Sequence, residues 1–316
     1  MSATTSTAPP PQRAPRTPHR SDRARQEARL GMMLCAPAIL VLLAVVGYPI
    51  LQAVWDSLFS YKLTNPDARS FVGLGNFVLV LSDSIWWQAL GVTVLITVVT
   101  VAVELVLGFA LALVMNNALS TLRPALRTAI LIPYAIITVV SAFAFRFMFD
   151  LTSGFMNLWL PFVPEDLDWF GSFGTSMAVV ALSEIWKTTP FISLLLLSGL
   201  AQVPGELQEA AKVDGATWWQ RMRRVTIPNM KAAIMVALLF RTLDAFRIFD
   251  NIFIMTNGAA GTESVAFLAY RQTIQRLEIG IGSAVSVLLT IAVALIAVMF
   301  VKGFKVNLAG STRAGR

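Results

Sequence analysis

Six long apolar stretches constrain this 316-residue chain more than any other feature. They lie approximately at residues 30–59, 89–115, 125–149, 176–200, 230–255 and 281–301. Each is long enough to cross the hydrocarbon core of a bilayer, because a helix needs about 20 mostly apolar residues to do so. Hydrophobic residues make up 56% of the chain and charged residues 14%, unlike the composition of a soluble domain. The sequence therefore predicts an all-α integral membrane protein with six transmembrane helices.

Residues 1–29 are rich in Pro, Thr, Ser and Arg and lack apolar periodicity, which is typical of a disordered tail. A secretory signal is the alternative, since a basic stretch precedes an apolar one. However, the run from Leu30 to Phe59 is much longer than the apolar core of a signal peptide, and no small-residue cleavage site follows it. We therefore expect an uncleaved first span, a membrane domain over residues 30–308 and a second tail at residues 309–316.

Lys and Arg residues predict which side of the membrane each loop faces, because cytoplasmic loops are enriched in them. They concentrate in the first tail, in the C-terminal tail and in two loops between spans. The loop residues are Arg123 and Arg127, followed by Lys212, Arg221, Arg223, Arg224 and Lys231. This distribution predicts that both termini and the loop over residues 204–228 are cytoplasmic.

Several classes of function are disfavoured by the composition. The net charge is +7, but the cations mostly flank apolar runs, so they indicate membrane topology rather than nucleic-acid binding. One cysteine, Cys35, and one histidine, His19, cannot form a disulfide or a Cys/His metal site within one chain. No Gly-x-x-x-x-Gly-Lys-Ser/Thr loop is present in the sequence, so we expect no ATP hydrolysis by this chain alone. We expect no catalytic residue, metal or cofactor in it.

The loop before the fifth span carries helix start and stop signals. Pro204 can begin a helix, and Gly215 can end it in a left-handed conformation. Thr217 and Gln220 have the spacing of a capping box for a second helix, and Pro228 is expected to end the unit. The loop is therefore predicted to be a helix-turn-helix.

The same loop contains a spaced motif: Glu209-Ala210-Ala211, three residues, Gly215, nine residues, Val225, one residue, and Ile227-Pro228. This pattern resembles the EAA signature in membrane subunits of ATP-binding-cassette (ABC) importers, although that family often has Ile and Leu where Val225 and Ile227 stand here. A basic interhelical loop of no special role is the alternative. It would account for the arginines but not for the paired alanines with the spaced Gly and Pro.

The resemblance implies a type I ABC importer permease with cytoplasmic coupling helices in a bacterial plasma membrane. It also implies contacts with an ATPase through Glu209, Ala210, Ala211, Asp214, Gly215 and Pro228. The implied partners are a second permease subunit, two nucleotide-binding ATPase subunits and an extracytoplasmic solute-binding protein. ATP and Mg would be bound by the ATPase subunits.

Ionisable residues cluster within the predicted spans, where an unpaired charge costs at least about 2.5 kcal/mol. Four of them recur every three residues on the fifth span and are expected to pair one turn apart: Arg241, Asp244, Arg247 and Asp250. Similar spacing predicts a Glu184–Lys187 pair and an Arg146–Asp150 pair, whereas Glu104 is alone on the second span.

Two interpretations of these charges remain open and overlap. In one, ion pairs hold the helices together. In the other, the charges line a polar translocation cavity, where Trp186, Thr188 and Asn251 add stacking and hydrogen-bonding groups for a sugar. A proton relay is less favoured, because no predicted span contains a histidine and the carboxylates have basic neighbours.

Two segments resemble the first permease subunit of actinobacterial trehalose importers: residues 184–191, Glu-Ile-Trp-Lys-Thr-Thr-Pro-Phe, and residues 240–251, Phe-Arg-Thr-Leu-Asp-Ala-Phe-Arg-Ile-Phe-Asp-Asn. This resemblance implies a neutral disaccharide as substrate, with trehalose the first choice. Another oligosaccharide or glycerol phosphate remains an alternative. An ion-coupled secondary transporter is the alternative class, but the sequence contains no convincing inverted repeat.

Overall fold

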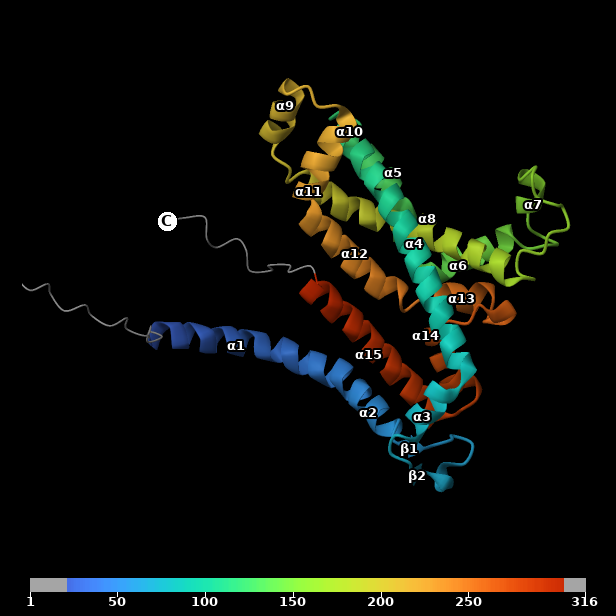
Figure 1. Cartoon of the computed structure of the whole chain (residues 1–316). Coiled ribbons are helices and arrows are strands. Elements are labelled where there is room, and N and C mark those ends of the chain that lie inside the picture. The colour runs from blue at the N-terminus through green and yellow to red at the C-terminus, as the bar shows by residue number, and fades with distance from the viewer. Residues whose placement is uncertain (1–21, 304–316) are drawn as a thin grey trace, which may run out of the picture. The chain divides into compact units, whose positions relative to one another are not determined.

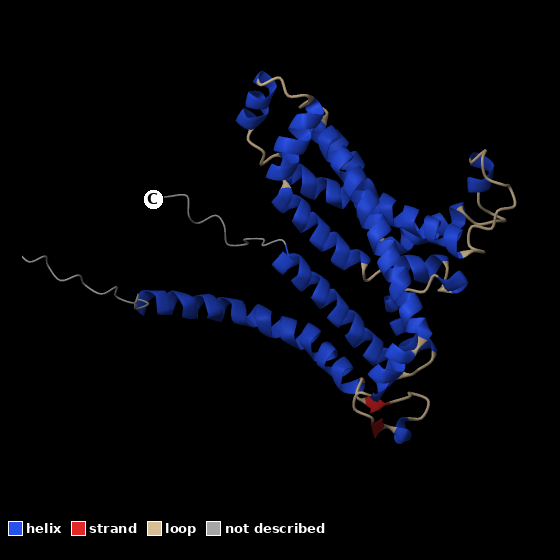
Figure 2. Ribbon diagram, viewed as in Figure 1, coloured by secondary structure: helices blue, strands red, loops and turns tan. Residues whose placement is uncertain are grey.

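The computed structural model describes residues 22–303, which are mostly helical (Figure 2). Within this range the strands are β1 (Phe59–Ser60) and β2 (Ser70–Phe71), which pair antiparallel. The chain divides into two compact units, residues 1–52 and 53–316. The predicted tails at residues 1–21 and 309–316, together with the predicted end of the membrane domain at residues 304–308, lie outside the described residues.

The first unit is dominated by a long helix. Helix α1 (Asp22–Leu42) continues through a π-helical turn, η1 (Leu43–Gly47), into α2 (Tyr48–Asp56). The segment Arg29–Asp56 is long and apolar enough to cross a membrane. The prediction of a disordered tail up to residue 29 is wrong for residues 22–29. These residues read Asp-Arg-Ala-Arg-Gln-Glu-Ala-Arg, and their Ala, Arg, Gln and Glu residues favour a helix that continues the span.

The second unit contains the remaining helices (Figure 1). Its longer helices are α4 (Ser84–Asn117), α5 (Arg123–Ala135), α6 (Thr138–Met148), α8 (Phe173–Leu200), α12 (Lys231–Ala245) and α15 (Ile279–Gly303). Its shorter elements are η2 (Pro66–Ala68), α3 (Gly75–Ser82), α7 (Met156–Trp159), α9 (Gly205–Val213), α10 (Trp218–Arg221), η3 (Met222–Thr226), α11 (Ile227–Asn229), α13 (Asp250–Met255), η4 (Ala259–Gly261), α14 (Val265–Tyr270) and η5 (Arg271–Gln275). Figure 1 shows α9 and α10 at one end of α4, and α3 with the β1–β2 hairpin at the other end.

The third apolar stretch forms two helices instead of one straight span. Helices α5 and α6 meet at an angle of 83°. The backbone is extended at Ile136 and Ile137, just after Pro133, which has no N–H to donate to a helix. Among residues 22–303, four helices are long and apolar enough to cross a membrane, or five if this bent pair is one span.

The fifth apolar stretch is also broken, so the prediction of one helix over residues 230–255 is wrong. Helix α12 ends at Ala245 and α13 begins at Asp250. The turn between them buries both Phe246 and Ile248. Residues two apart point in nearly opposite directions on a helix of 3.6 residues per turn, so an unbroken helix could not bury both on one face. The carbonyl of Ile248, freed by the break, accepts a hydrogen bond from the Ser264 hydroxyl at 2.8 Å.

Helices α4 and α8 pack closely along much of their length, with buried residues from both in the apolar core. The two helices approach each other closely at Gly108 of α4. A Cβ added there would lie 2.7 Å from Cγ2 of Ile192 and 3.3 Å from the backbone nitrogen of Ser193. The absence of a side chain at Gly108 therefore sets the distance between these two helices.

We expect Gly108→Val to destabilise the protein by about 1–3 kcal/mol, the usual penalty for overpacking a core. Gly91→Val on the same helix is the matched control, because a Cβ at Gly91 would have nothing within 4 Å. The measurement is the free energy of unfolding in mixed micelles. Equal destabilisation by the two substitutions would show that helix propensity, rather than the contact with Ile192, is responsible.

Candidate functional site

A buried arginine joins three helices of the second unit. The Nε of Arg241, on α12, donates to Oε2 of Glu104 on α4 at 2.5 Å, and its Nη2 donates to Oε1 of Glu184 on α8 at 2.5 Å. The side chains of Arg241 and Glu104 are 1% and 0% exposed. Because all three groups are charged and deeply placed, their pairing holds α4, α8 and α12 together.

Neighbouring polar groups complete this cluster. Nη1 of Arg241 donates to Oδ2 of Asp244 at 2.5 Å, and Nδ2 of Asn251 donates to Oε2 of Glu184 at 2.5 Å. The Thr188 hydroxyl lies 2.7 Å from Oε1 of Glu104 and 2.6 Å from the backbone oxygen of Glu184, and its single proton serves one of them at a time. The buried charges of the cluster are therefore paired through charge-assisted hydrogen bonds, as burial of charge requires.

The predicted series of ion pairs along the fifth span is confirmed only for Arg241 and Asp244. Arg247 donates from Nε to the backbone oxygen of Leu243 at 3.1 Å, and no ion pair joins Arg247 to Asp244 or Asp250 within residues 22–303. The physical reason is the break between α12 and α13, which removes the continuous helix face that the prediction assumed.

The predicted Glu184–Lys187 pair is wrong as well. Glu184 turns to Arg241, and Nζ of Lys187 lies 5.5 Å from the ring centroid of Tyr134. Glu104, which the sequence left without a partner, pairs with Arg241 across 137 positions of the chain. Both carboxylates therefore take their partner from another helix, α12.

The predicted Arg146–Asp150 pair does not form either. Nη1 of Arg146 donates to the backbone oxygen of Met255 at 2.9 Å. Asp150 lies just beyond α6 and accepts hydrogen bonds from the backbone N–H and the hydroxyl of both Ser153 and Thr152. These hydrogen bonds hold the pKa of the Asp150 carboxyl below its usual range. The bond from the Ser153 backbone N–H contributes most to this lowering.

A polar cavity of about 420 Å³ adjoins the buried cluster. It is lined by Tyr134, Thr138, Glu184, Lys187, Thr188, Asp244, Arg247, Ile248, Phe249, Asp250 and Asn251. Its volume lies within the usual range for small-molecule sites, about 300–1,000 Å³. Asn251 lines this cavity, and its buried Oδ1 has no hydrogen-bond partner among the described residues.

Most of the predicted pathway residues meet at this cavity, with two exceptions. Arg241 lies behind the wall and orients Glu184 and Asp244, which line it. Trp186 does not line the cavity, and its ring lies 5.7 Å from that of Phe145.

Sequence reasoning missed Glu104 as a site residue. A lone carboxylate in the middle of a long apolar helix was the signal available, because such a charge requires a partner. The identity of that partner could not be read from the local pattern.

The loop between α8 and α12 forms the predicted helix-turn-helix. Pro204 precedes α9, Gly215 is left-handed with φ +75°, and the capping box between Thr217 and Gln220 is present. The prediction that Pro228 ends the unit is wrong, because α11 runs through it to Asn229. Pro228 lies in the first turn of α11, where proline is tolerated. The π-helical turn η3 ends at Thr226, immediately before α11.

The predicted ATPase-contact residues lie together on this loop. Glu209, Ala210, Asp214 and Gly215 are exposed, and Ala211 is half-buried. The loop is braced by Nε2 of Gln208, on α9, which donates to the Thr226 hydroxyl on η3 at 2.7 Å.

Comparison with known proteins agrees with this architecture. The trehalose transport system permease protein SugA of Mycobacterium tuberculosis is 47% identical over 92% of this chain and 93% of its own length. The trehalose/maltose transport system permease protein MalF of Thermococcus litoralis is 36% identical, covering 88% of this chain and 94% of its own.

The fold is also similar to a chain in the crystal structure of a bacterial ABC transporter involved in the import of the acidic polysaccharide alginate. The TM-score is 0.75 at 20% identity, with 90% of this chain and 100% of that chain covered. Residues 104–306 match the family described as binding-protein-dependent transport system inner membrane component. The chain therefore belongs to this family of inner membrane transport components.

Proposed function

We propose that this chain is a permease subunit of an ATP-driven sugar importer and forms half of its translocation pathway. The observation that carries the proposal is the polar cavity beside the Arg241 cluster, in a chain that is 47% identical to a trehalose permease protein. The proposed substrate is trehalose or a related neutral disaccharide. The cavity provides both donors and acceptors, such as Lys187 and Asn251, which the hydroxyl groups of a sugar require.

The connection between the cytoplasmic loop and the cavity supports a coupling role. The loop over residues 204–228 begins where α8 ends and leads into α12. Both helices contribute to the cavity wall, through Glu184 and Thr188 on α8 and Asp244 on α12. A displacement of the loop by an ATPase would therefore move two walls of the cavity together and support alternating access.

The proposed assembly contains a second permease subunit, two ATPase subunits that bind ATP and Mg, and an extracytoplasmic solute-binding protein. Glu209, Ala210, Ala211, Asp214, Gly215 and Pro228 are the proposed ATPase contacts. The bent pair α5–α6 counts as one span, and we propose that α12 and α13 together form another. In the membrane we propose six spans in all, with both termini cytoplasmic. The distribution of Lys and Arg supports this orientation.

The test is reconstitution of the chain, purified with its native partners, into proteoliposomes that contain ATP. Labelled trehalose, maltose and glycerol 3-phosphate are compared as substrates in the presence of the solute-binding protein. We expect trehalose uptake that requires ATP. Uptake driven by a sodium or proton gradient without ATP would instead establish a secondary transporter, and a preference for glycerol 3-phosphate would refute the sugar assignment.

We expect Asp244→Asn and Arg247→Gln to impair sugar uptake more than Trp169→Phe does. Asp244 and Arg247 line the cavity, whereas the Trp169 indole donates to Asn157 at 2.5 Å, away from the cavity lining. Loss of a hydrogen bond to a charged group corresponds to about a tenfold or larger change in affinity. Initial uptake rates across a range of trehalose concentrations measure the effect. Equal impairment by all three substitutions would favour a purely structural role for these charges.

A further inference from the structure

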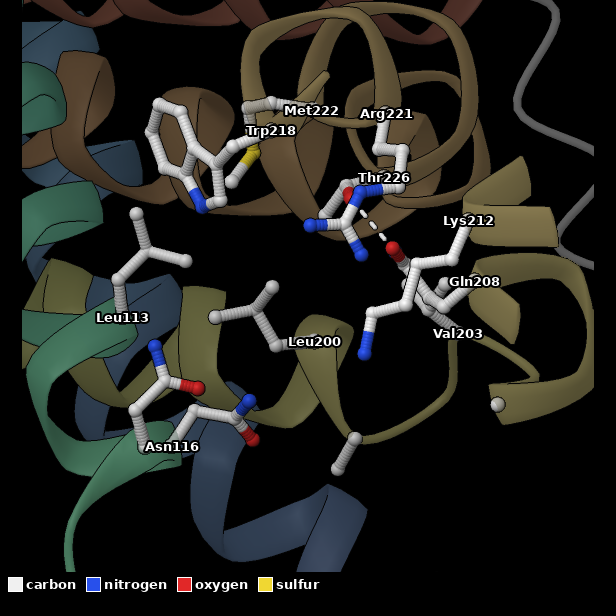
Figure 3. A pocket seen from close by; sticks show the side chains of 13 residues that line it. Leu113, Asn116, Leu200, Val203, Gln208, Lys212, Trp218, Arg221, Met222 and Thr226 are labelled. Atoms are coloured by element: carbon white, nitrogen blue, oxygen red, sulfur yellow. Dashed lines mark hydrogen bonds between the residues drawn. The ribbon is translucent and has the colours of Figure 1, made fainter. Parts of the chain in front are cut away.

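A second cavity, of about 530 Å³, lies where the loop joins the helix ends (Figure 3). Its walls come from the C-terminal ends of α4 and α8 and from α9, α10 and η3. The lining residues are Leu113, Asn116, Asn117, Leu200, Ala201, Val203, Gly205, Gln208, Lys212, Trp218, Arg221, Met222 and Thr226. None of them lines the polar cavity beside the Arg241 cluster.

The lining of this second cavity is cationic. It contains Lys212 and Arg221 and no carboxylate. Figure 3 shows the Lys212 amine, the Arg221 guanidinium and the indole nitrogen of Trp218 directed into the cavity. Three donors from α9 and α10 therefore converge on one space, and two of them carry a positive charge.

These donors lack partners within the described part of the chain. Nε of Arg221 is buried and has no hydrogen-bond partner there, and Lys212 forms no ion pair within residues 22–303. The buried Nε of Arg221 is left unfavourably placed without an acceptor, because it has lost water and gained nothing in return, whereas the Lys212 side chain is exposed. The wall itself is already held by the bond from Gln208 to Thr226, so these cations are not needed to close it.

We propose that this cavity binds a phosphate group, carried either by an anionic lipid headgroup or by a soluble phosphate compound. A guanidinium and an ammonium on two elements suit the several oxygens of a phosphate. Leu113, Leu200 and Met222 add apolar surface beside the cations, and the volume is large enough for more than the phosphate alone. Basic pockets among helices at the cytoplasmic side of membrane proteins are suited to such headgroups.

Occupancy of this site would act on the loop. A phosphate held between Lys212 on α9 and Arg221 on α10 links the two arms of the helix-turn-helix next to the end of α4. The ligand would therefore stiffen the segment that connects α8 with α12. Stiffening of this loop by a phosphate ligand is a separate property from sugar transport, and binding of the phosphate requires neither ATP nor sugar.

The test is a titration of the full chain, purified with any native subunits that accompany it, in a phosphate-free polyoxyethylene detergent after delipidation. Inorganic phosphate and phosphatidylglycerol, the latter as mixed micelles with the same detergent, are added separately, and tryptophan fluorescence is followed. We expect a saturable change that is lost in Trp218→Phe. Lys212→Gln and Arg221→Gln should each raise the apparent Kd about tenfold or more, as expected for loss of a charge-assisted hydrogen bond.

Arg223→Gln and Arg224→Gln are the matched controls, because these exposed cations lie on the adjacent turn but do not line the cavity. Saturation by inorganic phosphate identifies a soluble ligand, and saturation by phosphatidylglycerol alone identifies a lipid. No response to either ligand, or equal weakening by the control substitutions, would overturn the proposal. If Arg221→Gln fails to fold, the Lys212→Gln variant tests the proposal instead. The Lys212 side chain is exposed and has no partner within residues 22–303, so its replacement should not affect folding. Absence of ATP-driven uptake would leave this binding result unaffected.

Discussion

Replacement of Arg241 by methionine is expected to destabilise the protein by about 3–5 kcal/mol, the usual effect of breaking a buried ion pair. Methionine retains much of the volume of arginine but leaves Glu104 and Glu184 without their cation. Glu104 is fully buried, so water cannot replace the lost partner. The free energy of unfolding in mixed micelles, and the yield of monodisperse protein, measure the loss.

Arg247→Met is the matched control for this prediction. It removes the same charge from the same segment, but the Arg247 side chain is exposed, and its one hydrogen bond among the described residues is to the backbone oxygen of Leu243. The double variant Glu104→Gln/Arg241→Met should recover part of the loss, because it removes the buried charge that the single change leaves unpaired. Equal destabilisation by Arg241→Met and Arg247→Met would contradict the role assigned to the cluster.

Replacement of Glu209 by tryptophan is expected to abolish ATP-driven uptake while leaving the chain inserted in the membrane. The Glu209 side chain is exposed and has no hydrogen bond or ion pair within the described residues, so its loss should not affect folding. A bulky ring beside Ala210 would instead obstruct the close approach of an ATPase. Uptake into proteoliposomes and the ATPase retained on purification are the two measurements.

Gly215→Val tests the same surface by another route. Gly215 has φ +75°, and a left-handed backbone costs an L-residue about 1–2 kcal/mol. A Cβ there would meet nothing within 4 Å, so the effect should stay within the loop. Glu165→Trp controls for a bulky residue at an exposed glutamate outside the loop. Normal uptake with normal ATPase retention in both Glu209→Trp and Gly215→Val would eliminate the docking assignment.

Charged residues of the predicted spans form two groups, those of the buried cluster and those that line the polar cavity. Arg241, Glu104 and Glu184 are buried together, whereas the Asp244 side chain is 67% exposed and also lines the cavity. The ion-pair interpretation is therefore supported for the three buried groups, and the assignment of Asp244 to a translocation pathway stays a prediction. Glu184 belongs to both, since one of its oxygens pairs with Arg241 and its side chain lines the cavity.

Local chemistry was sufficient to predict the features that depend on a few consecutive residues. Apolar stretches of membrane length predicted α4, α8 and α15, because hydrophobic length is a property of the segment alone. The left-handed Gly215 and the capping box at Thr217 were predicted for the same reason. The spaced EAA pattern indicated the family, which the comparisons then showed.

Tertiary packing decided which charges pair and where helices break. Spacing along one helix predicted partners three or four residues apart, but Arg241 and Glu104 are separated by 137 positions and meet because α4, α8 and α12 pack against one another. The turn at residues 246–249 depends on burying Phe246 and Ile248 together, which no local propensity encodes. Periodicity in a sequence describes one helix at a time, whereas a buried charge takes whichever partner the neighbouring helices bring within reach.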